Sequence, residues 1–295
     1  MTILIDRDTK VLVQGATGSV GAFQTKIMLE YGTQIVAAVT PGKGGQEVHG
    51  VPIYDFVSTA CAKHPVDVAL SFVPNRFALD AAFEVIDGGI PFLVLTAEGV
   101  PERDMMALLN HAARNQTRVL GPDTPGLIAP GRCKVGVHPN RMYAPGRVGV
   151  LSKSGALSYE VGKALTEAGI GQSTVVGIGG GPLWGTTQEE VLRMFEEDPE
   201  TDVIVLLGEV GGTMEYRAAS LIETCISKPV VALIVGRAAP RGAQMGHAGA
   251  IVEGDRGTAA SKIEALDAAG AHIARSPSQI PEIIKRLDIT GVAAP

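Results

Sequence analysis

The sequence predicts two α/β domains in tandem, each built on an open, largely parallel sheet. Short apolar runs alternate with helical patterns along most of the chain, which is typical of doubly wound sheets. The alternation stops over residues 126–146 and then restarts, and both halves begin with an apolar run, a glycine-containing turn and a helix. The length of 295 residues also suits two domains. We therefore expect a first domain over residues 1–130, a connection over 131–146 and a second domain over 147–295.

The expected strands are continuous apolar runs, as strands buried on both faces of a sheet require. In the first half, strands are expected at Val11–Gln14, Ile35–Val39, Val68–Phe72, Phe92–Leu95 and Val119–Leu120, and helices at Gly21–Glu30, Val57–Ala62, Arg76–Asp87 and Glu102–Asn115. Glycine and proline then crowd Gly126–Gly146, where we expect a crossing connection. In the second half, strands are expected at Arg147–Leu151, Ser173–Ile178, Val203–Leu207, Val230–Val235 and Ala271–Ala274, and helices at Ala156–Glu167, Gln188–Glu197, Glu215–Thr224, Thr258–Ala269 and from Pro281.

Composition excludes several classes of protein. Glycine makes up 37 of the 295 residues, well above its usual share of about 7%, but it follows no three-residue period and the chain is not collagen-like. The formal net charge of -6 and the 4% aromatic content argue against a nucleic-acid partner, which needs a basic stripe or a stacking platform. We expect the glycines at tight turns, where positive φ or close backbone approach is needed.

Other features of the chain predict a cytoplasmic protein without a metal. The longest apolar runs, such as Val203–Leu207, are far shorter than the roughly 20 residues that cross a membrane, so we expect no membrane association. Charged residues follow Ile3–Ile5 directly, which leaves no signal-peptide core. The cysteines are three in number and widely spaced, and no histidine shows metal-ligand spacing.

The first candidate site is the glycine-rich turn Gly15–Gly21, which follows a strand and opens a helix. Thr17, Gly18, Ser19 and Val20 lie in this turn, where backbone N–H groups and the helix dipole would cradle a phosphate. Its spacing is G-x-x-G-x-x-G, and the second strand ends in a loop with Lys43 instead of the carboxylate that binds a nicotinamide ribose. A ligand with an additional phosphate is therefore favoured over NAD; a turn without ligand is the alternative.

Two further turns follow strands of the first half. Leu95, Thr96, Ala97 and Glu98 end one strand and could contact the same ligand, although a simple helix-capping turn would explain them too. The turn Gly121–Gly126 contains Asp123 and Thr124 between two prolines and two glycines, which favours a rigid backbone shape. It suits either a pocket wall or a structural turn between domains.

Three features of the second half suggest phosphoryl chemistry. Ser154 and Gly155 open a helix, as an anion site or a simple N-cap would. His247 lies among small residues in Gly246–Ala250, which leaves its ring open, although a lone histidine is usually only solvated or packed in the core. Glu209 ends a strand and could accept a hydrogen bond from one ring nitrogen, leaving the other nucleophilic.

The chain resembles the α subunits of succinyl-CoA synthetases (succinate–CoA ligases, ADP- or GDP-forming) over nearly its whole length. The motifs that carry the resemblance are Gly15–Gly21, Val39–Gly45, Ser154-Gly155 before Tyr159-Glu160, Gly177-Ile178-Gly179-Gly180, Gly208-Glu209 and Met245–Ile251. The resemblance implies a Rossmann-like CoA-binding domain over residues 1–130 and a flavodoxin-like phosphohistidine domain over 147–295. It also implies an acid–thiol ligase of the tricarboxylic acid cycle type. CoA would bind to Thr17–Val20, Lys43 and the Leu95–Glu98 turn. ATP or GTP, with Mg, would bind to a separate ATP-grasp β subunit in an αβ or α2β2 assembly.

The resemblance also implies roles around the histidine. His247 would be phosphorylated during turnover, Glu209 would orient it, the helix that begins near Ser154 and Gly155 would hold the phosphate, and Tyr159 would lie near the carboxylic acid substrate. The chain departs from the family pattern at Asp123 and Thr124, which replace asparagine and cysteine, and at Gly181, Trp184 and Arg141–Tyr143. Malate–CoA ligase, the small subunit of citryl-CoA synthetase and a non-catalytic CoA-binding protein therefore remain alternatives.

Overall fold

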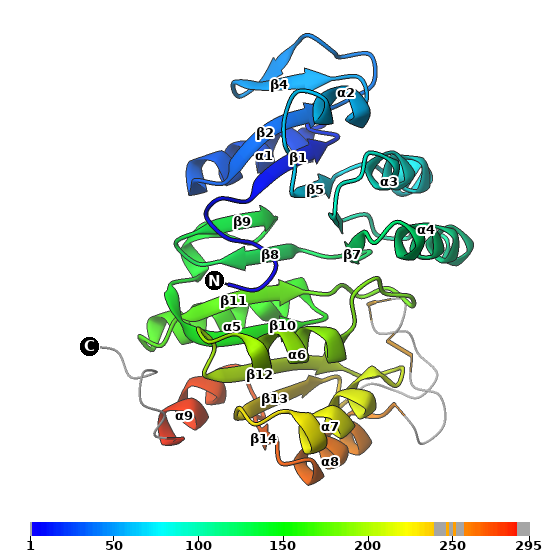
Figure 1. The fold of residues 1–295 in the computed structure, drawn as a ribbon. Coiled ribbons are helices and arrows are strands. Elements are labelled where there is room, and N and C mark those ends of the chain that lie inside the picture. Colours follow the sequence, from blue (N-terminus) through cyan, green and yellow to red (C-terminus); the bar gives the residue numbers. More distant parts are fainter. Residues whose placement is uncertain (1, 239–245, 248–249, 252–256, 288–295) are drawn as a thin grey trace.

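The computed structural model describes residues 2–238, 246–247, 250–251 and 257–287. These residues form two seven-stranded sheets with helices on their faces, which confirms the predicted pair of α/β domains. Figure 1 shows the first domain in blue and cyan above the second, which runs from green to red. The strand order changes direction beside the strand Lys10–Gln14 in the first sheet and beside the strand Pro145–Ser152 in the second, and such points form ligand crevices at the carboxyl ends of parallel strands.

The first sheet has the strand order β3-β4-β2-β1-β5-β6-β7. Its strands are β1 (Lys10–Gln14), β2 (Gln34–Val39), β3 (Glu47–Val48), β4 (Val51–Tyr54), β5 (Val68–Ser71), β6 (Phe92–Leu95) and β7 (Arg118–Leu120). All neighbours pair in parallel except β3 and β4, a short hairpin that the sequence analysis did not predict. The helices are α1 (Ser19–Tyr31), α2 (Val57–Cys61), α3 (Ala78–Asp87) and α4 (Glu102–Arg114), with a 3-10 turn at Asn75–Phe77.

The second sheet has the strand order β14-β13-β12-β10-β11-β8-β9. Its strands are β8 (Gly126–Ala129), β9 (Cys133–Gly136), β10 (Pro145–Ser152), β11 (Gln172–Gly177), β12 (Val203–Glu209), β13 (Val230–Val235) and β14 (His272–Ile273). The helices are α5 (Gly155–Glu167), α6 (Gln188–Glu197), α7 (Met214–Cys225), α8 (Ala259–Ala268) and α9 (Gln279–Arg286), with a 3-10 turn at Asn140–Met142. These bounds agree with the expected elements to within a few residues.

The segment Gly126–Gly146 corrects the expectation of a crossing connection. Its first part is the antiparallel hairpin β8–β9, which pairs with β11 and extends the second sheet. Gly126 and Gly136 face each other across the hairpin, and a Cβ built on Gly126 would lie only 2.0 Å from the Val135 carbonyl oxygen. The glycines therefore allow two strands to approach closely. The sequence analysis had interpreted them as signs of an irregular connection. The sheet of the second domain accordingly begins before residue 131, within what was expected to be the first domain.

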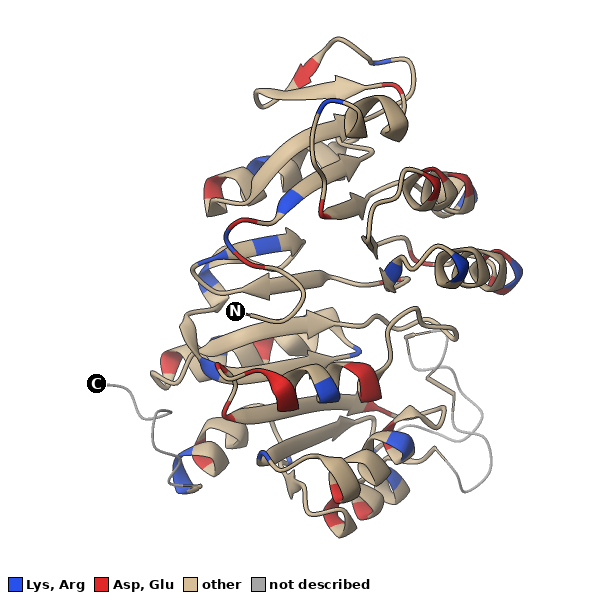
Figure 2. Ribbon diagram, viewed as in Figure 1, with Lys and Arg blue, Asp and Glu red and all other residues tan. Residues whose placement is uncertain are grey.

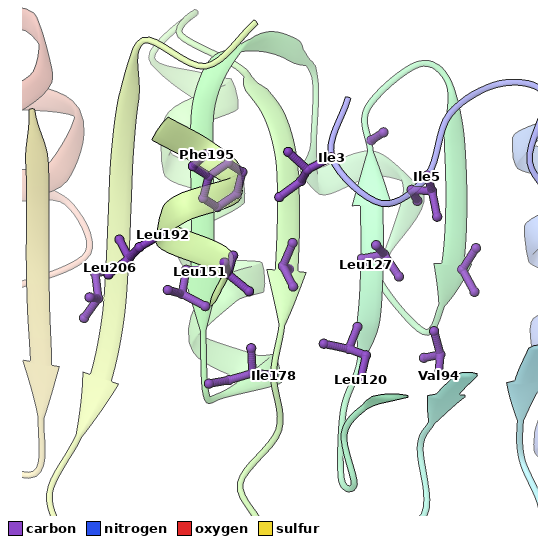
Figure 3. Close-up of a cluster of buried hydrophobic side chains, with 14 of the residues drawn as sticks. Ile3, Ile5, Val94, Leu120, Leu127, Leu151, Ile178, Leu192, Phe195 and Leu206 are labelled. Carbon is purple, nitrogen blue, oxygen red and sulfur yellow. The ribbon is translucent and has the colours of Figure 1, made fainter. Parts of the chain in front are cut away.

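The apolar core continues from one domain into the other. Figure 3 shows Ile3 and Ile5 of the N-terminal segment in one cluster with Leu127 of β8 and Phe195 of α6. Phe195 is fully buried and packs against β10, where a Cβ on Gly149 would lie 2.6 Å from its ring. This continuous packing holds the carboxyl edges of the two sheets in a defined relation.

Charged side chains lie mainly on the helices and loops, as Figure 2 shows. The buried strands are almost entirely apolar, as parallel strands covered on both faces require. No helix among the described residues is long and apolar enough to span a membrane.

Replacing the buried ring of Phe195 tests the packing of the second domain. Phe195→Ala is expected to lower the free energy of unfolding by about 3–5 kcal/mol, because the substitution leaves a cavity against β10. Urea unfolding followed by the fluorescence of Trp184, the only tryptophan, measures the change. Phe23→Ala is the control, since Phe23 is 59% exposed. This substitution should lower the free energy of unfolding by less than about 0.5 kcal/mol. Equal losses in both variants would contradict this account of the core.

Candidate functional site

A cavity of about 330 Å³ lies between the carboxyl edges of the two sheets. Val20, Phe72 and Thr96 line it from the first domain, and His247, Gly155 and Tyr159 line it from the second. The turn that joins the domains supplies the rest of the wall, including Asp123 and Thr124. The structure therefore brings together predicted site residues from both domains.

A larger cavity of about 910 Å³ adjoins the glycine-rich turn of the first domain. Gly18, Ser19 and Val20 line it, together with the aromatic side chains of Phe56 and Phe77. These two rings are 60% and 50% exposed, although aromatic residues are scarce in the chain. Val20 and Phe72 line both cavities. A long ligand could therefore reach from the glycine-rich turn to His247.

The glycine-rich turn has the geometry of a phosphate cradle. Gly15 has a φ of +74°, and its N–H donates to the Val39 carbonyl oxygen over 2.9 Å. Gly21 comes so close to this turn that a Cβ on it would lie 2.2 Å from the Gly15 carbonyl oxygen. Gly18 is the N-cap of α1 and has no side chain to bind the first amides of the helix. These N–H groups face the cavity region and suit an anionic group.

The remaining residues predicted for this ligand have different surroundings. Thr17 and Lys43 are exposed and border the turn and the loop after β2 without lining either cavity. Leu95 is completely buried in the core of the first domain, so its side chain is not available to a ligand. The carbonyl of Ala97 accepts a hydrogen bond from the N–H of Asp123 over 3.0 Å, and Glu98 is exposed. The Leu95–Glu98 turn thus supports the turn between the domains.

His247 and Glu209 form the central pair of the second domain. Nδ1 of the ring lies 2.7 Å from Oε2 of Glu209, the last residue of β12. A carboxylate can only accept, so Nδ1–H donates and Nε2 carries the free lone pair. The hydrogen bond that Nδ1–H donates to Glu209 is the main cause that raises the pKa of His247, and burial opposes this effect.

Close backbone approach seats the histidine ring. A Cβ built on Gly180, in the loop after β11, would lie 2.3 Å from Cγ of His247. Gly155, at the start of α5, lines the same cavity as the ring. Ser154 caps α5, its hydroxyl accepting from the N–H of Leu157 over 3.3 Å. The capping alternative is therefore confirmed for the Ser154 side chain, while helix amides remain open to an anion.

The turn between the domains is held by Thr124. Its buried hydroxyl accepts from the N–H of Gly126 over 2.8 Å and donates to the Gly177 carbonyl. Asp123 adopts a φ of +56° and reaches the cavity, where burial and the nearby charge of Glu98 raise the pKa of its carboxyl. Tyr159 packs edge-on against the buried His138, with ring centres 5.5 Å apart.

The sequence analysis missed three buried charged residues behind His247. Lys153 and Lys262 surround Glu209 and Glu215, and none of these four side chains is more than 8% exposed. The sequence did contain one indication: Lys262 lies on the face of α8 that also carries the buried Ala259 and Leu266. A lysine on an apolar face is almost never buried without a partner.

The described part of the chain contains no group of three or more residues that could hold a metal ion. Its three cysteines, Cys61, Cys133 and Cys225, are free thiols.

Substituting Gly180 tests whether the backbone seats the histidine. Gly180→Ala is expected to displace the His247 ring, because the new methyl group would lie only 2.3 Å from Cγ of the ring. The ring should then react faster with diethyl pyrocarbonate, measured as the mass shift of the peptide that contains His247. Gly181→Ala is the matched control, since the atom nearest to its Cβ would be a ring carbon of Pro122 at 3.2 Å, which leaves His247 untouched. Unchanged reactivity in Gly180→Ala would contradict the seating of the ring.

The pKa of His247 provides a second test. Glu209→Gln keeps an acceptor for Nδ1–H but removes the negative charge, so the pKa should fall. An NMR titration of the ring Cε1–H signal, assigned with His247→Asn, measures the change. Since the folded chain raises this pKa, ring protonation stabilises the fold below the ordinary histidine pKa, and this contribution disappears as the pH rises through the raised value. Glu209→Gln should remove this pH dependence, and an unaltered titration would contradict the role of Glu209.

Comparison with known proteins places this geometry in a family. Residues 6–99 match the model of the CoA binding domain and residues 151–272 that of CoA-ligase. The chain is 50% identical to succinate–CoA ligase [ADP-forming] subunit alpha 1 of Archaeoglobus fulgidus, covering 97% of this chain and 98% of that protein. It is 52% identical to the corresponding alpha subunit of Methanothermobacter thermautotrophicus, with 96% of both chains covered.

Solved structures agree. An ATP citrate lyase from Methanosaeta concilii, in complex with (3S)-citryl-CoA, superposes with a TM-score of 0.88 at 28% identity; the alignment covers 99% of this chain and 53% of that one. The dinucleotide-forming acetyl-coenzyme A synthetase 1 of Ca. Korarchaeum cryptofilum gives a TM-score of 0.76 at 25% identity, covering 95% of this chain and 61% of that one. This chain thus spans a little over half the length of both. By its curated relatives, the chain belongs to the family of succinate–CoA ligase alpha subunits, which are acid–thiol ligases.

Proposed function

We propose that this chain is the alpha subunit of a nucleoside-triphosphate-dependent carboxylic acid–CoA ligase that forms succinyl-CoA through a phosphohistidine at His247. The observation that carries the proposal is the hydrogen bond from Nδ1 of His247 to Glu209, in a cavity that both domains line. It fixes the ring tautomer and leaves Nε2 as the nucleophile. The names of the curated relatives support the same activity.

CoA is the proposed ligand of the first domain. The 910 Å³ cavity combines the glycine-rich turn, which suits the phosphates, with apolar walls that include Phe56 and Phe77. It adjoins the His247 cavity at Val20 and Phe72, so the thiol end of the ligand could reach the reacting group. Thr17 lies in the glycine-rich turn and Lys43 in the loop after β2; both are exposed and would contact the phosphates, whereas Leu95 would contribute backbone only.

The proposed reaction has three steps. Nε2 of His247 attacks the γ-phosphorus of ATP or GTP, forming the N–P bond as the nucleoside diphosphate leaves. A carboxylate oxygen of the acid then attacks this phosphorus, which frees the histidine and gives an acyl phosphate. The CoA thiolate finally attacks the acyl carbon and expels inorganic phosphate. Amides at the start of α5, beside Gly155, would stabilise the phosphoryl charge.

A beta subunit is the proposed partner, as the alpha-subunit names of the relatives imply. We propose that it is an ATP-grasp protein that binds ATP or GTP with Mg, in an αβ or α2β2 assembly, and that the pair works in the cytoplasm. Isothermal titration with CoA and NAD separates this proposal from an oxidoreductase: CoA should bind and NAD should not.

The acid is proposed to be succinate, with malate and citrate as alternatives. Asp123 and Thr124 line the cavity beside Tyr159, at positions where the chain departs from the family pattern. A panel of succinate, malate, citrate, itaconate and a sulfinate analogue, given to the reconstituted subunit pair, would identify the acid by the rate of CoA thioester formation.

Replacing the histidine tests the mechanism. In the presence of the partner subunit and γ-³²P-ATP, the wild-type chain should become labelled and His247→Asn should not. Thioester formation should fall by about 10³-fold or more, because the phosphoryl acceptor is lost. CoA affinity should stay unchanged in His247→Asn, which serves as the control for folding. Normal turnover of this variant would refute the phosphohistidine mechanism. CoA binding without labelling of the wild type would instead indicate a non-catalytic CoA-binding protein.

A further inference from the structure

A charge cluster of two lysines and two glutamates lies directly behind His247. Nζ of Lys153 is 3.4 Å from Oε1 of Glu209 and 3.4 Å from Oε1 of Glu215. Nζ of Lys262 contacts the other oxygen of Glu215 and donates to the Glu209 carbonyl over 2.8 Å. Lys153 directly follows β10, and Glu209 is the last residue of β12. Glu215 lies on α7, and Lys262 lies on α8. Four elements thus converge on one charge-balanced cluster.

Glu209 divides its two carboxylate oxygens between a lysine and the histidine. Oε2 receives Nδ1–H of His247 at 2.7 Å, while Oε1 faces Lys153 and has no hydrogen-bond partner of good geometry. Lys153 is held in turn by the ring of Trp184, whose centre lies 5.0 Å from Nζ. The indole N–H of Trp184 donates to the Gly179 carbonyl over 2.9 Å. The lysine therefore has a fixed position beside the carboxylate.

The charge count of the cluster has a chemical consequence. Without Lys153, two buried carboxylates would face only Lys262, and a protonated His247 would supply the missing positive charge. A protonated ring has no lone pair and cannot attack phosphorus. We propose that Lys153 is a positioning residue that balances the charge of Glu209, so that this carboxylate fixes the tautomer of His247 without holding the ring protonated.

Several charged groups among the described residues lie close to His247 and Glu209, and each of them affects the protonation of the ring. Lys153 and Glu215 lie behind Glu209, Lys262 lies behind Glu215, and the carboxyl of Asp123 faces His247 across the cavity. The pKa of Glu215 is lowered: burial opposes its ionisation, and the two lysines outweigh burial. Lys153 lowers the pKa of His247, against the larger effect of Glu209. The signs of these effects agree with the proposed role.

The experiment compares His247 titrations by NMR in the full chain. Lys153→Met should raise the pKa of His247 by about one unit, because a nearby positive charge is lost. Glu215→Gln should lower the pKa of His247, because the positive charge of Lys153 then faces the negative charge of Glu209 alone. Lys153→Arg should restore the wild-type titration. A packing defect alone would not shift the pKa in opposite directions in two variants of the same cluster.

Reactivity is the second readout. Labelling of the ring by phosphoramidate, measured as the ratio of each variant to wild type at each pH, follows the neutral form of His247. For Lys153→Met this ratio should be about 0.1 at pH values below the raised pKa of His247, and it should return to 1 at high pH. Lys134→Met is the matched control, because Lys134 is also fully buried but donates only to the His138 carbonyl and to Asn140. It should lose stability without a shift in the titration.

Several outcomes would overturn the proposal. One is an unshifted or lowered pKa of His247 in Lys153→Met; another is a shift of the same sign in Lys134→Met. If Lys153→Met does not fold, an unshifted or raised pKa in Glu215→Gln would refute it. The importance of a neutral ring for turnover rests on the proposed phosphohistidine, but neither readout needs ligase activity. Failure of His247 labelling by ATP with the partner subunit would refute the proposed function and leave the charge balance intact.

Discussion

The hydrogen bond between His247 and Glu209 is the interaction on which the arrangement of the second domain depends. Glu209 is the last residue of strand β12, and its buried carboxylate is costly unless it is paired. The lysines that pair the cluster come from the loop after β10 and from α8. Sheet order, helix placement and the position of the histidine are thus linked through one carboxylate.

Glycine serves a different purpose around this pair. At Gly180 the absent side chain makes room for the histidine ring, and at Gly21 it lets a helix start against the turn that precedes it. At Gly126 and Gly136 it lets two strands approach at the edge of the sheet. In each case the gain is close contact in an ordered structure, which explains how a chain so rich in glycine forms two compact domains.

The contact between the domains decides what the site can do. The core cluster that includes Ile3, Leu127 and Phe195 continues across the boundary, and the carbonyl of Ala97 binds the N–H of Asp123. The carboxyl edges of two independent sheets therefore meet at one cavity. In the proposed reaction, a ligand bound by its phosphates in the first domain presents its thiol end beside His247 of the second, and this proximity is what a ligation reaction needs.

The sequence by itself determined the two α/β domains, nearly all strand and helix positions, the glycine-rich turn and the candidate pair His247 and Glu209, because apolar period and turn residues are local properties. The resemblance to the family also came from contiguous motifs. Only the tertiary structure decided that β8 and β9 join the second sheet, that Leu95 points into the core, and that Gly180 seats the histidine ring. It also brought Lys153, Glu215 and Lys262 to one carboxylate from positions up to 109 residues apart along the chain. Charge balance in a buried cluster depends on distances in space, which strand order and helix packing set and which no local pattern of residues contains.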